Sequence, residues 1–207
     1  MKYSVLFLIF FICSAGHAQK RMVKSFSADN IDVINFKFDQ IYLIELNSSE
    51  TQNIQIEAQV EGENSEHIVL TNRKYANGLF ISSDYQPAYK DENDKLSAHK
   101  VISVFLSIKV PKEKTIYLKS DIANVKARGD FKKLTIELVN GNCDIADFYG
   151  NALINTQEGN IDLTADNAKV SAQSESGKVS AEELIEGLNE IELYSRNGDI
   201  TITKSQE

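Results

Sequence analysis

Apolar and polar residues alternate along most of the chain from residue 111 onward, and the alternation repeats with a fixed period. Gly141, Gly159 and Gly177 lie eighteen residues apart, Ala123 takes the same place eighteen residues earlier, and Gly198 follows after twenty-one. A period of two with one apolar face is typical of β-strands. Each repeat is therefore predicted to be a strand, a glycine corner, a second strand and a return.

Aligning the repeats on their corners produces four apolar columns, two on each side of the corner. The columns are Ile116, Leu134, Ala152, Val170 and Ile191; Leu118, Ile136, Ile154, Ala172 and Leu193; Val125, Cys143, Ile161, Val179 and Ile200; and Ala127, Ile145, Leu163, Ala181 and Ile202. Repeats that bury their inner face only by stacking are typical of a β-solenoid. The return at residues 182–190 is three residues longer than the others, and an insertion confined there keeps both strands in register.

The N-terminal region does not follow the eighteen-residue period. Residues 31–46 and 54–62 alternate and are separated by polar turns, which predicts further strands. We expect this β-rich region to cap or continue the solenoid, because an open first coil would expose an unpaired strand edge. The expected organisation is a signal peptide at 1–18, the β-rich region at 19–110 and the solenoid repeats at 111–207, with the last two forming one continuous domain.

The first eighteen residues have the pattern of a secretory signal peptide: a lysine, an apolar run and small residues ending at Ala18. The sequence therefore predicts an exported protein, located in the periplasm, on the outer surface or in the medium, and no later apolar run is long enough for a transmembrane helix. The formal net charge is −8 and becomes −9 without Lys2, which argues against nucleic acid as a partner. Cys143 would then be the one remaining thiol, so packing rather than a disulfide must hold the chain together.

The repeats also resemble a known family. The segments "LVNGNCDI", "TQEGNIDL" and "SRNGDITI", preceded by "IKVPKEKTIYLKSDIANV", are similar to the repeats of bacterial adhesin-like β-solenoid domains of unknown function, the auto-transporter adhesin head domains and their DUF4097-like and DUF2807 relatives. The resemblance is strongest over residues 101–203. It implies an exported or envelope-associated bacterial protein with a right-handed parallel β-helix, and it supplies no catalytic residues.

Candidate reactive groups fit structural roles better than catalytic ones. Cys143 stands in an apolar column, and free cysteines are among the most buried residues. His67 and His99 have no spacing typical of a metal site, so neither a metal nor another cofactor is expected. Outward acids such as Asp144 and Asp162 could form a calcium-binding row like that of polysaccharide lyases. A solvated polar face is the favoured interpretation of these acids. Residues 128–130 form the cell-adhesion tripeptide Arg-Gly-Asp, and the favoured interpretation is that it occurs there by chance.

The longest irregular segment runs from Tyr85 to Lys100. It contains Pro87, two tyrosines and a dense charge cluster, and long loops on rigid scaffolds often carry recognition. Tyr85, Tyr89 and His99 are therefore the candidate partner-binding residues, for a protein or glycan at the cell envelope. The alternative for the two tyrosines is that they cover the open end of the apolar stack. The predicted function is non-enzymatic adhesion, binding or envelope structure, with a polysaccharide lyase or hydrolase on the same scaffold as the alternative. The sequence does not predict the oligomeric state.

Overall fold

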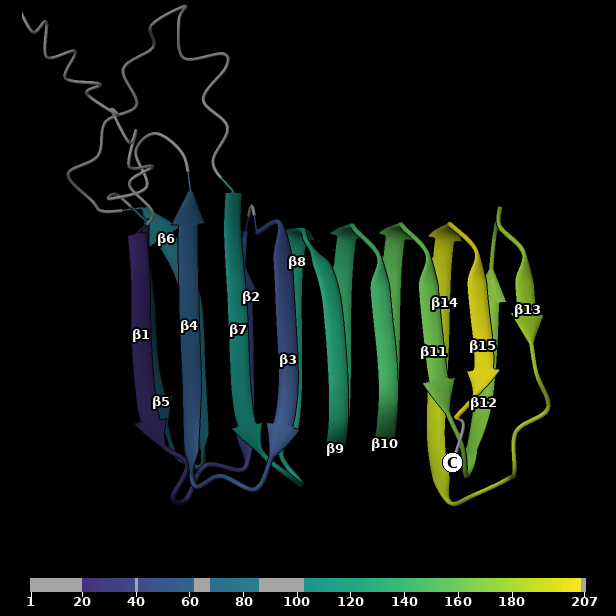
Figure 1. The fold of residues 1–207 in the computed structure, drawn as a ribbon, viewed down its shortest axis with the longest axis horizontal. Coiled ribbons are helices and arrows are strands. Elements are labelled where there is room, and N and C mark those ends of the chain that lie inside the picture. The colour runs from purple at the N-terminus through teal and green to yellow at the C-terminus, as the bar shows by residue number, and fades with distance from the viewer. Residues whose placement is uncertain (1–19, 40, 62–67, 86–102, 206–207) are drawn as a thin grey trace, which may run out of the picture.

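The computed structural model describes residues 20–39, 41–61, 68–85 and 103–205, and in these residues the fold is all-β with no helix (Figure 1). The predicted all-β class is confirmed. The fifteen strands are β1 (Lys20–Ser27), β2 (Val33–Phe38), β3 (Leu43–Ser49), β4 (Asn53–Glu61), β5 (Ile68–Tyr75), β6 (Gly78–Tyr85), β7 (Ser103–Pro111), β8 (Thr115–Ile122), β9 (Asn124–Asn140), β10 (Cys143–Glu158), β11 (Ile161–Ala165), β12 (Ala168–Ser174), β13 (Val179–Ala181), β14 (Asn189–Asn197) and β15 (Ile200–Lys204).

The strands lie in two rows that share one apolar interior. The front row has the order β1-β4-β7-β3-β9-β10-β11-β15-β13, and the back row has the order β5-β6-β2-β8-β9-β10-β14-β12 (Figure 1). β9 and β10 are 17 and 16 residues long and contribute to both rows. Their first halves pair in the front row and their second halves in the back row, and pairing in register brings residues eighteen apart side by side.

Inward side chains of the aligned columns are buried in all but one repeat. Val125, Cys143, Ile161 and Ile200 are at most 1 % exposed, whereas Val179 in the same column is 46 % exposed. The difference follows from stacking, since a residue with a neighbouring layer on each side loses its contact with water. The repeat that contains Val179 must therefore lie at the end of the stack.

The stacking order departs from the order of the sequence. Ile200 pairs on one side with Ile161 and on the other with Val179, so the last repeat is inserted between the two that precede it. The back row shows the same insertion, because Ile191 lies between Ala152 and Val170. The chain thus skips one layer between β11 and β12 and then returns to fill it. The three additional residues in the return before β14 provide the length for this crossing.

The corners require glycine mainly because successive layers approach closely. A Cβ on Gly159 would lie 2.0 Å from the carbonyl oxygen of Gly141, and a Cβ on Gly141 would lie 1.8 Å from that of Ala123. Within the column of corner glycines, only Gly141 has a φ in the left-handed region, at 143°. Close packing of backbone against backbone, rather than a left-handed backbone conformation, is therefore the more general reason for glycine at these corners.

A ladder of side-chain hydrogen bonds runs along the residues that follow the corners. The Asn160 N–H donates to Asn142 Oδ1 at 2.8 Å, and the Asp199 N–H donates to Asn160 Oδ1 at 2.8 Å. The Lys178 N–H then donates to Asp199 Oδ1 at 2.7 Å, and the ladder starts where the Asn142 N–H donates to Asn124 Oδ1 at 3.2 Å. This ladder follows the inserted order of the repeats, and it satisfies corner N–H groups that the strands do not use.

The N-terminal region continues the stack. Ile44 of β3 pairs in parallel with Val125, and Ile34 of β2 pairs in parallel with Ile116. Buried apolar residues form one cluster that extends from Ala28 to Ile202. Farther from the repeats the pairing becomes antiparallel, between β7 and β4 and between β4 and β1.

Candidate binding surfaces

A shallow groove of about 220 Å³ lies on the outer face of the back row. β6, β2, β8 and β9 place outward side chains there in one row, because Phe80 pairs with Asn35, Asn35 with Tyr117, and Tyr117 with Thr135. The outer face of a sheet is the usual position for polar residues, so two aromatic side chains in one such row are distinctive. The lining residues are Asn35, Phe36, Lys37, Phe80, Tyr117, Leu118, Lys119, Thr135 and Glu137.

Polar contacts hold the side chains around the groove in place. Asn35 Nδ2 donates to the hydroxyl of Tyr75, and the guanidinium of Arg73 lies 5.8 Å from the centre of the Phe80 ring. Lys119 and Glu137 form an exposed ion pair with an Nζ–Oε2 distance of 3.3 Å. Exposed pairs of this kind contribute little stability, so their charges remain available to a ligand.

The chemistry of this groove suits binding through stacked rings. Tyr117 is 41 % exposed and lies beside Thr135, whose Oγ1 is buried and has no hydrogen-bond partner among the described residues. Aromatic faces next to amide, ammonium and carboxylate groups can stack on a sugar or on a planar side chain while polar groups bind its edges. The alternation along the chain did not predict this groove, although Phe80 and Tyr117 are visible in the sequence as aromatic residues at outward positions.

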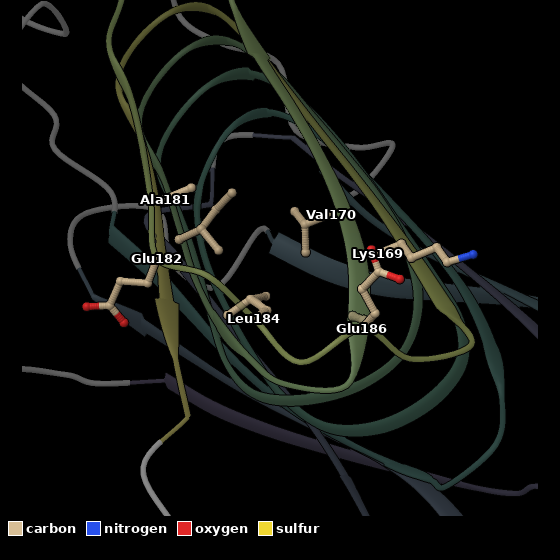
Figure 2. A pocket seen from close by; sticks show the side chains of 8 residues that line it. Lys169, Val170, Ala181, Glu182, Leu184 and Glu186 are labelled. Atoms are coloured by element: carbon tan, nitrogen blue, oxygen red, sulfur yellow. The ribbon is translucent and has the colours of Figure 1, made fainter.

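A second hollow, of about 380 Å³, lies at the end of the stack formed by β12 and β13 (Figure 2). Figure 2 shows Val170, Ala181 and Leu184 around it, with the carboxylate of Glu186 at its margin and that of Glu182 directed away from it. The interior is apolar because Val170 and Ala181 continue the buried columns of the preceding layers and Leu184 packs against the core. No further layer covers them in the part of the chain that the structure describes.

Residues 182–188, here called the crossing segment, pass over this end and close it in part. The Ala168 N–H donates to the Ile185 carbonyl oxygen at 3.2 Å, and the Ile185 N–H donates to Asp166 Oδ1 at 3.1 Å. Leu184 packs against the core, whereas Ile185 and Leu188 are exposed. The end of the stack therefore presents apolar side chains to solvent.

The loop candidates from the sequence lie almost entirely outside the described residues. Tyr85 is the last residue of β6 and pairs through its backbone with Ile68. Tyr89 and His99 belong to residues 86–102, which the structure does not describe, and His67 and the signal-like residues 1–18 are outside the described ranges as well. The loop thus stays a prediction.

Cys143 is fully buried in its apolar column. Burial disfavours the charged thiolate and raises the pKa of this thiol to about 12. The predicted packing role of Cys143 agrees with this position, because a reactive cysteine needs an accessible thiolate.

The outward acids stack only in part. Asp144 and Asp162 are paired neighbours, but the next residues in their row are Lys126 and Thr201. In the returns, Asp130 lies beside Tyr149 rather than beside another acid. Within the described ranges, no group of three or more His, Cys, Asp or Glu residues is arranged to hold a metal ion.

The Arg-Gly-Asp tripeptide lies in a corner that is bound within the protein. The Asp130 N–H donates to Ser48 Oγ at 2.6 Å, and the Asp130 carboxylate lies 2.9 Å from Lys112 Nζ. Lys112 also contacts Glu50 at 3.1 Å, and hydrogen bonds to the two carboxylates raise the pKa of Lys112. The aspartate is therefore engaged with its own chain.

One comparison with solved structures is informative about the fold. The chain matches a structure described as a "putative cell adhesion protein" from Clostridium sporogenes ATCC 15579, with a TM-score of 0.66 and 15 % identity, over 90 % of this chain and 100 % of that chain. The chain has the fold of that protein. A "putative adhesin" from Bacteroides fragilis NCTC 9343 also matches, with a TM-score of 0.35 and 14 % identity, over 90 % of this chain and 97 % of that chain.

Sequence-based comparisons returned nothing. No family model matches the chain, and a search of curated proteins finds no similar sequence. The described residues contain no helix long and apolar enough to cross a membrane.

Proposed function

We propose that this protein is an exported, non-enzymatic adhesin-like protein of the bacterial cell envelope. Support comes from the fold, which is shared over nearly the whole chain with a protein described as a cell adhesion protein, and from the signal-like N-terminus. The resemblance of the corner segments to adhesin-like β-solenoid domains of the auto-transporter head and DUF4097-like type leads to the same class of protein.

The proposed architecture is one continuous domain from residue 19 onward, a right-handed parallel β-helix with coils of about eighteen residues. The parallel pairing of Cys143 with Val125 and with Ile161 supports the coil length. The single buried cluster from Ala28 to Ile202 supports continuity between the two halves. A stack of this kind is rigid, because every coil is hydrogen-bonded to its neighbours along both rows.

We propose the groove around Phe80 and Tyr117 as the adhesive surface, for a glycan or a protein side chain at the cell envelope. The observation that carries this proposal is the row Phe80–Asn35–Tyr117–Thr135, which places two rings and several polar groups side by side on the outer face. The loop from Tyr85 to Lys100 follows the same strand β6 that holds Phe80. Tyr85, Tyr89 and His99 are therefore proposed to extend the contact beyond the groove.

Tyr117→Ala tests this surface, with Tyr149→Ala as the matched control. Tyr149 is 55 % exposed and does not line the groove. The probes are an array of immobilised glycans and a panel of immobilised matrix proteins, with the melting temperature checking the fold. Loss of a stacked ring should lower the affinity for the bound probe about tenfold.

Two results would contradict the proposal. If Tyr149→Ala reduced binding as much as Tyr117→Ala, the groove would not be the contact surface. If the unmodified protein bound none of the probes while it catalysed cleavage of a polysaccharide, the enzymatic alternative would replace adhesion.

A further inference from the structure

Both ends of the stack have unpaired strands in the described chain. At the end formed by β1 and β5, here called the head, β1 pairs only with β4 and β5 only with β6. At the end formed by β12, β13 and the crossing segment, here called the tail, β13 pairs only with β15 and β12 only with β14. Unpaired edges are places where another chain can add a strand.

The directions of the edge strands allow one copy to follow another. β1 and β13 belong to the front row and run in the same direction. The antiparallel pairings β1–β4 and β4–β7 reverse the strand direction twice, and all later pairings in the row are parallel. β5 and β12 belong to the back row and run in opposite directions, since β5–β6 is the single antiparallel pairing between them. A second copy placed along the stack would therefore meet a parallel pair in front and an antiparallel pair behind, and both kinds of ladder form hydrogen bonds.

The two ends have opposite charge. The head strands β1 and β5 contain five Lys or Arg residues and no carboxylate, namely Lys20, Arg21, Lys24, Arg73 and Lys74. The tail, formed by β12, β13 and the crossing segment, contains three carboxylates, those of Glu182, Glu183 and Glu186, and one lysine, Lys169. Such complementarity favours head against tail and disfavours two like ends meeting.

The partly buried apolar side chains that pack against the core lie at the same two ends. The partly buried apolar residues that pack against the core are Met22 and Phe26 in β1, Val170 and Ala172 in β12, and Leu184 in the crossing segment. Each has one side covered by its own stack and the other side open. A copy added at either end would cover them and fill the tail hollow.

Lysines limit association at the head. The Nζ of Lys24 donates to the Leu70 carbonyl oxygen, and the Nζ of Lys20 donates to that of Ile68 at 3.2 Å, so both ammonium groups lie across the interior between the two rows. Inward lysines of this kind discourage uncontrolled edge pairing. They also place positive charge where a second copy would bring Glu183 and Glu186 of its tail.

We propose that the protein assembles head to tail, with the acidic, apolar tail of one copy docking on the basic head of the next. Such a contact is heterologous, so it continues into a linear array instead of closing as a dimer. The proposal is independent of the adhesive groove, which lies on the outer face, and an array would multiply the number of grooves on one particle.

Site-directed cross-linking tests the arrangement. Val23→Cys marks the head and Ser180→Cys marks the tail, both at exposed positions on their outermost strands. The secreted chain with its own buried Cys143 is the background control, and a short bismaleimide is the reagent. Mixing the two variants should give a heterodimer, each variant alone should give none above background, and the double variant should give a ladder of oligomers.

Charge reversal at the tail provides the second measurement. Glu183→Lys with Glu186→Lys should lower the heterodimer yield at least fivefold, and added salt should do the same, because the attraction is between exposed charges. Glu45→Lys, at an exposed position of β3 between β7 and β9 in the middle of the front row, is the matched control and should leave the yield unchanged.

Three outcomes would overturn the assembly. One is cross-linking of either single variant to itself as efficiently as the mixture, which would indicate head-to-head or tail-to-tail contact. The second is a mixture that yields no more heterodimer than the background. The third is a yield that falls as much with Glu45→Lys as with the two tail substitutions. Tyr117→Ala should cross-link normally, so failure of the adhesive groove and failure of the assembly can be distinguished.

Discussion

The inserted order of the repeats makes a sharp prediction for two residues of one apolar column. Ile200 is fully buried between Ile161 and Val179, whereas Val179 is 46 % exposed at the end of the stack. In a stack that followed the order of the sequence, the positions would be reversed, with Val179 enclosed and Ile200 at the end. Substituting each by alanine therefore measures which repeat is inside.

The expected magnitudes follow from burial. Ile200→Ala removes buried methyl and methylene groups and leaves a cavity between two layers, which costs about 2–5 kcal/mol of the free energy of unfolding. Val179→Ala removes half-exposed groups and should cost about 1 kcal/mol or less. In a domain of this size, a loss of about 3 kcal/mol lowers Tm by roughly 6–12 °C. Ile161→Ala, enclosed in either order, is the control and should resemble Ile200→Ala.

Chemical denaturation of the purified chain is the assay, with Tm as a second measurement. Both variants should keep the slope of the unfolding transition, which reports that the exposed surface is unchanged. A larger loss for Val179→Ala than for Ile200→Ala would refute the inserted order. The difference in size between the two side chains is one methylene, worth about 0.8 kcal/mol, and does not account for the expected gap.

Three further predictions concern the core and the corners. Ile161→Asp buries an unpaired carboxylate and should cost several kcal/mol, while Asp162→Ala on the outer face should change the free energy of unfolding by under about 1 kcal/mol; equal Tm shifts would contradict the assigned register. Gly159→Ala places a methyl group 2.0 Å from a backbone oxygen of the adjacent layer, so it should lower Tm. A Tm within about 2 °C of the parent would show that the two backbones do not approach this closely. Cys143 should react with a maleimide slowly in the native protein at pH 9 and rapidly in denaturant, since burial raises its pKa to about 12; fast labelling of the native protein would mean that the thiol is accessible. The contribution of the buried neutral thiol to the free energy of unfolding is complete below the pKa of the thiol in the unfolded chain, and it declines as pH rises toward 12.

The candidate surfaces show why a site can be missed in an accurate pattern of strands. Phe80, Asn35, Tyr117 and Thr135 come from four separate strands, and only Tyr117 and Thr135 are related by the eighteen-residue spacing. Each is an outward position, which the alternation identifies but does not distinguish from its polar neighbours. Their proximity depends on β2 lying between β6 and β8, and that arrangement is not encoded in any local signal.

The repeats show what the local sequence pattern predicts and what it leaves undetermined. The alternation around each corner identified Ile161, Val179 and Ile200 as members of one inward column, because the side-chain direction along a strand depends only on its period of two. The pattern could not order them, because the columns consist of interchangeable aliphatic residues and any repeat can stack on any other. The order was decided by the crossing segment and by hydrogen bonds such as that from Lys178 N–H to Asp199 Oδ1, which exist only when the layers are assembled.

The N-terminal half shows the same limit of local sequence pattern. Its strands were visible as alternation, and their general role of capping or continuing the stack followed from the need to cover an open edge. Their partners were not visible, because Ile44 pairs with Val125 across eighty-one residues and β1 pairs antiparallel with β4. The sequence by itself determined the all-β class, the inward faces and the corners, since these depend on neighbours along the chain. The tertiary structure alone decided the order of the layers, the groove and the two unlike ends, since these depend on which strands meet in space.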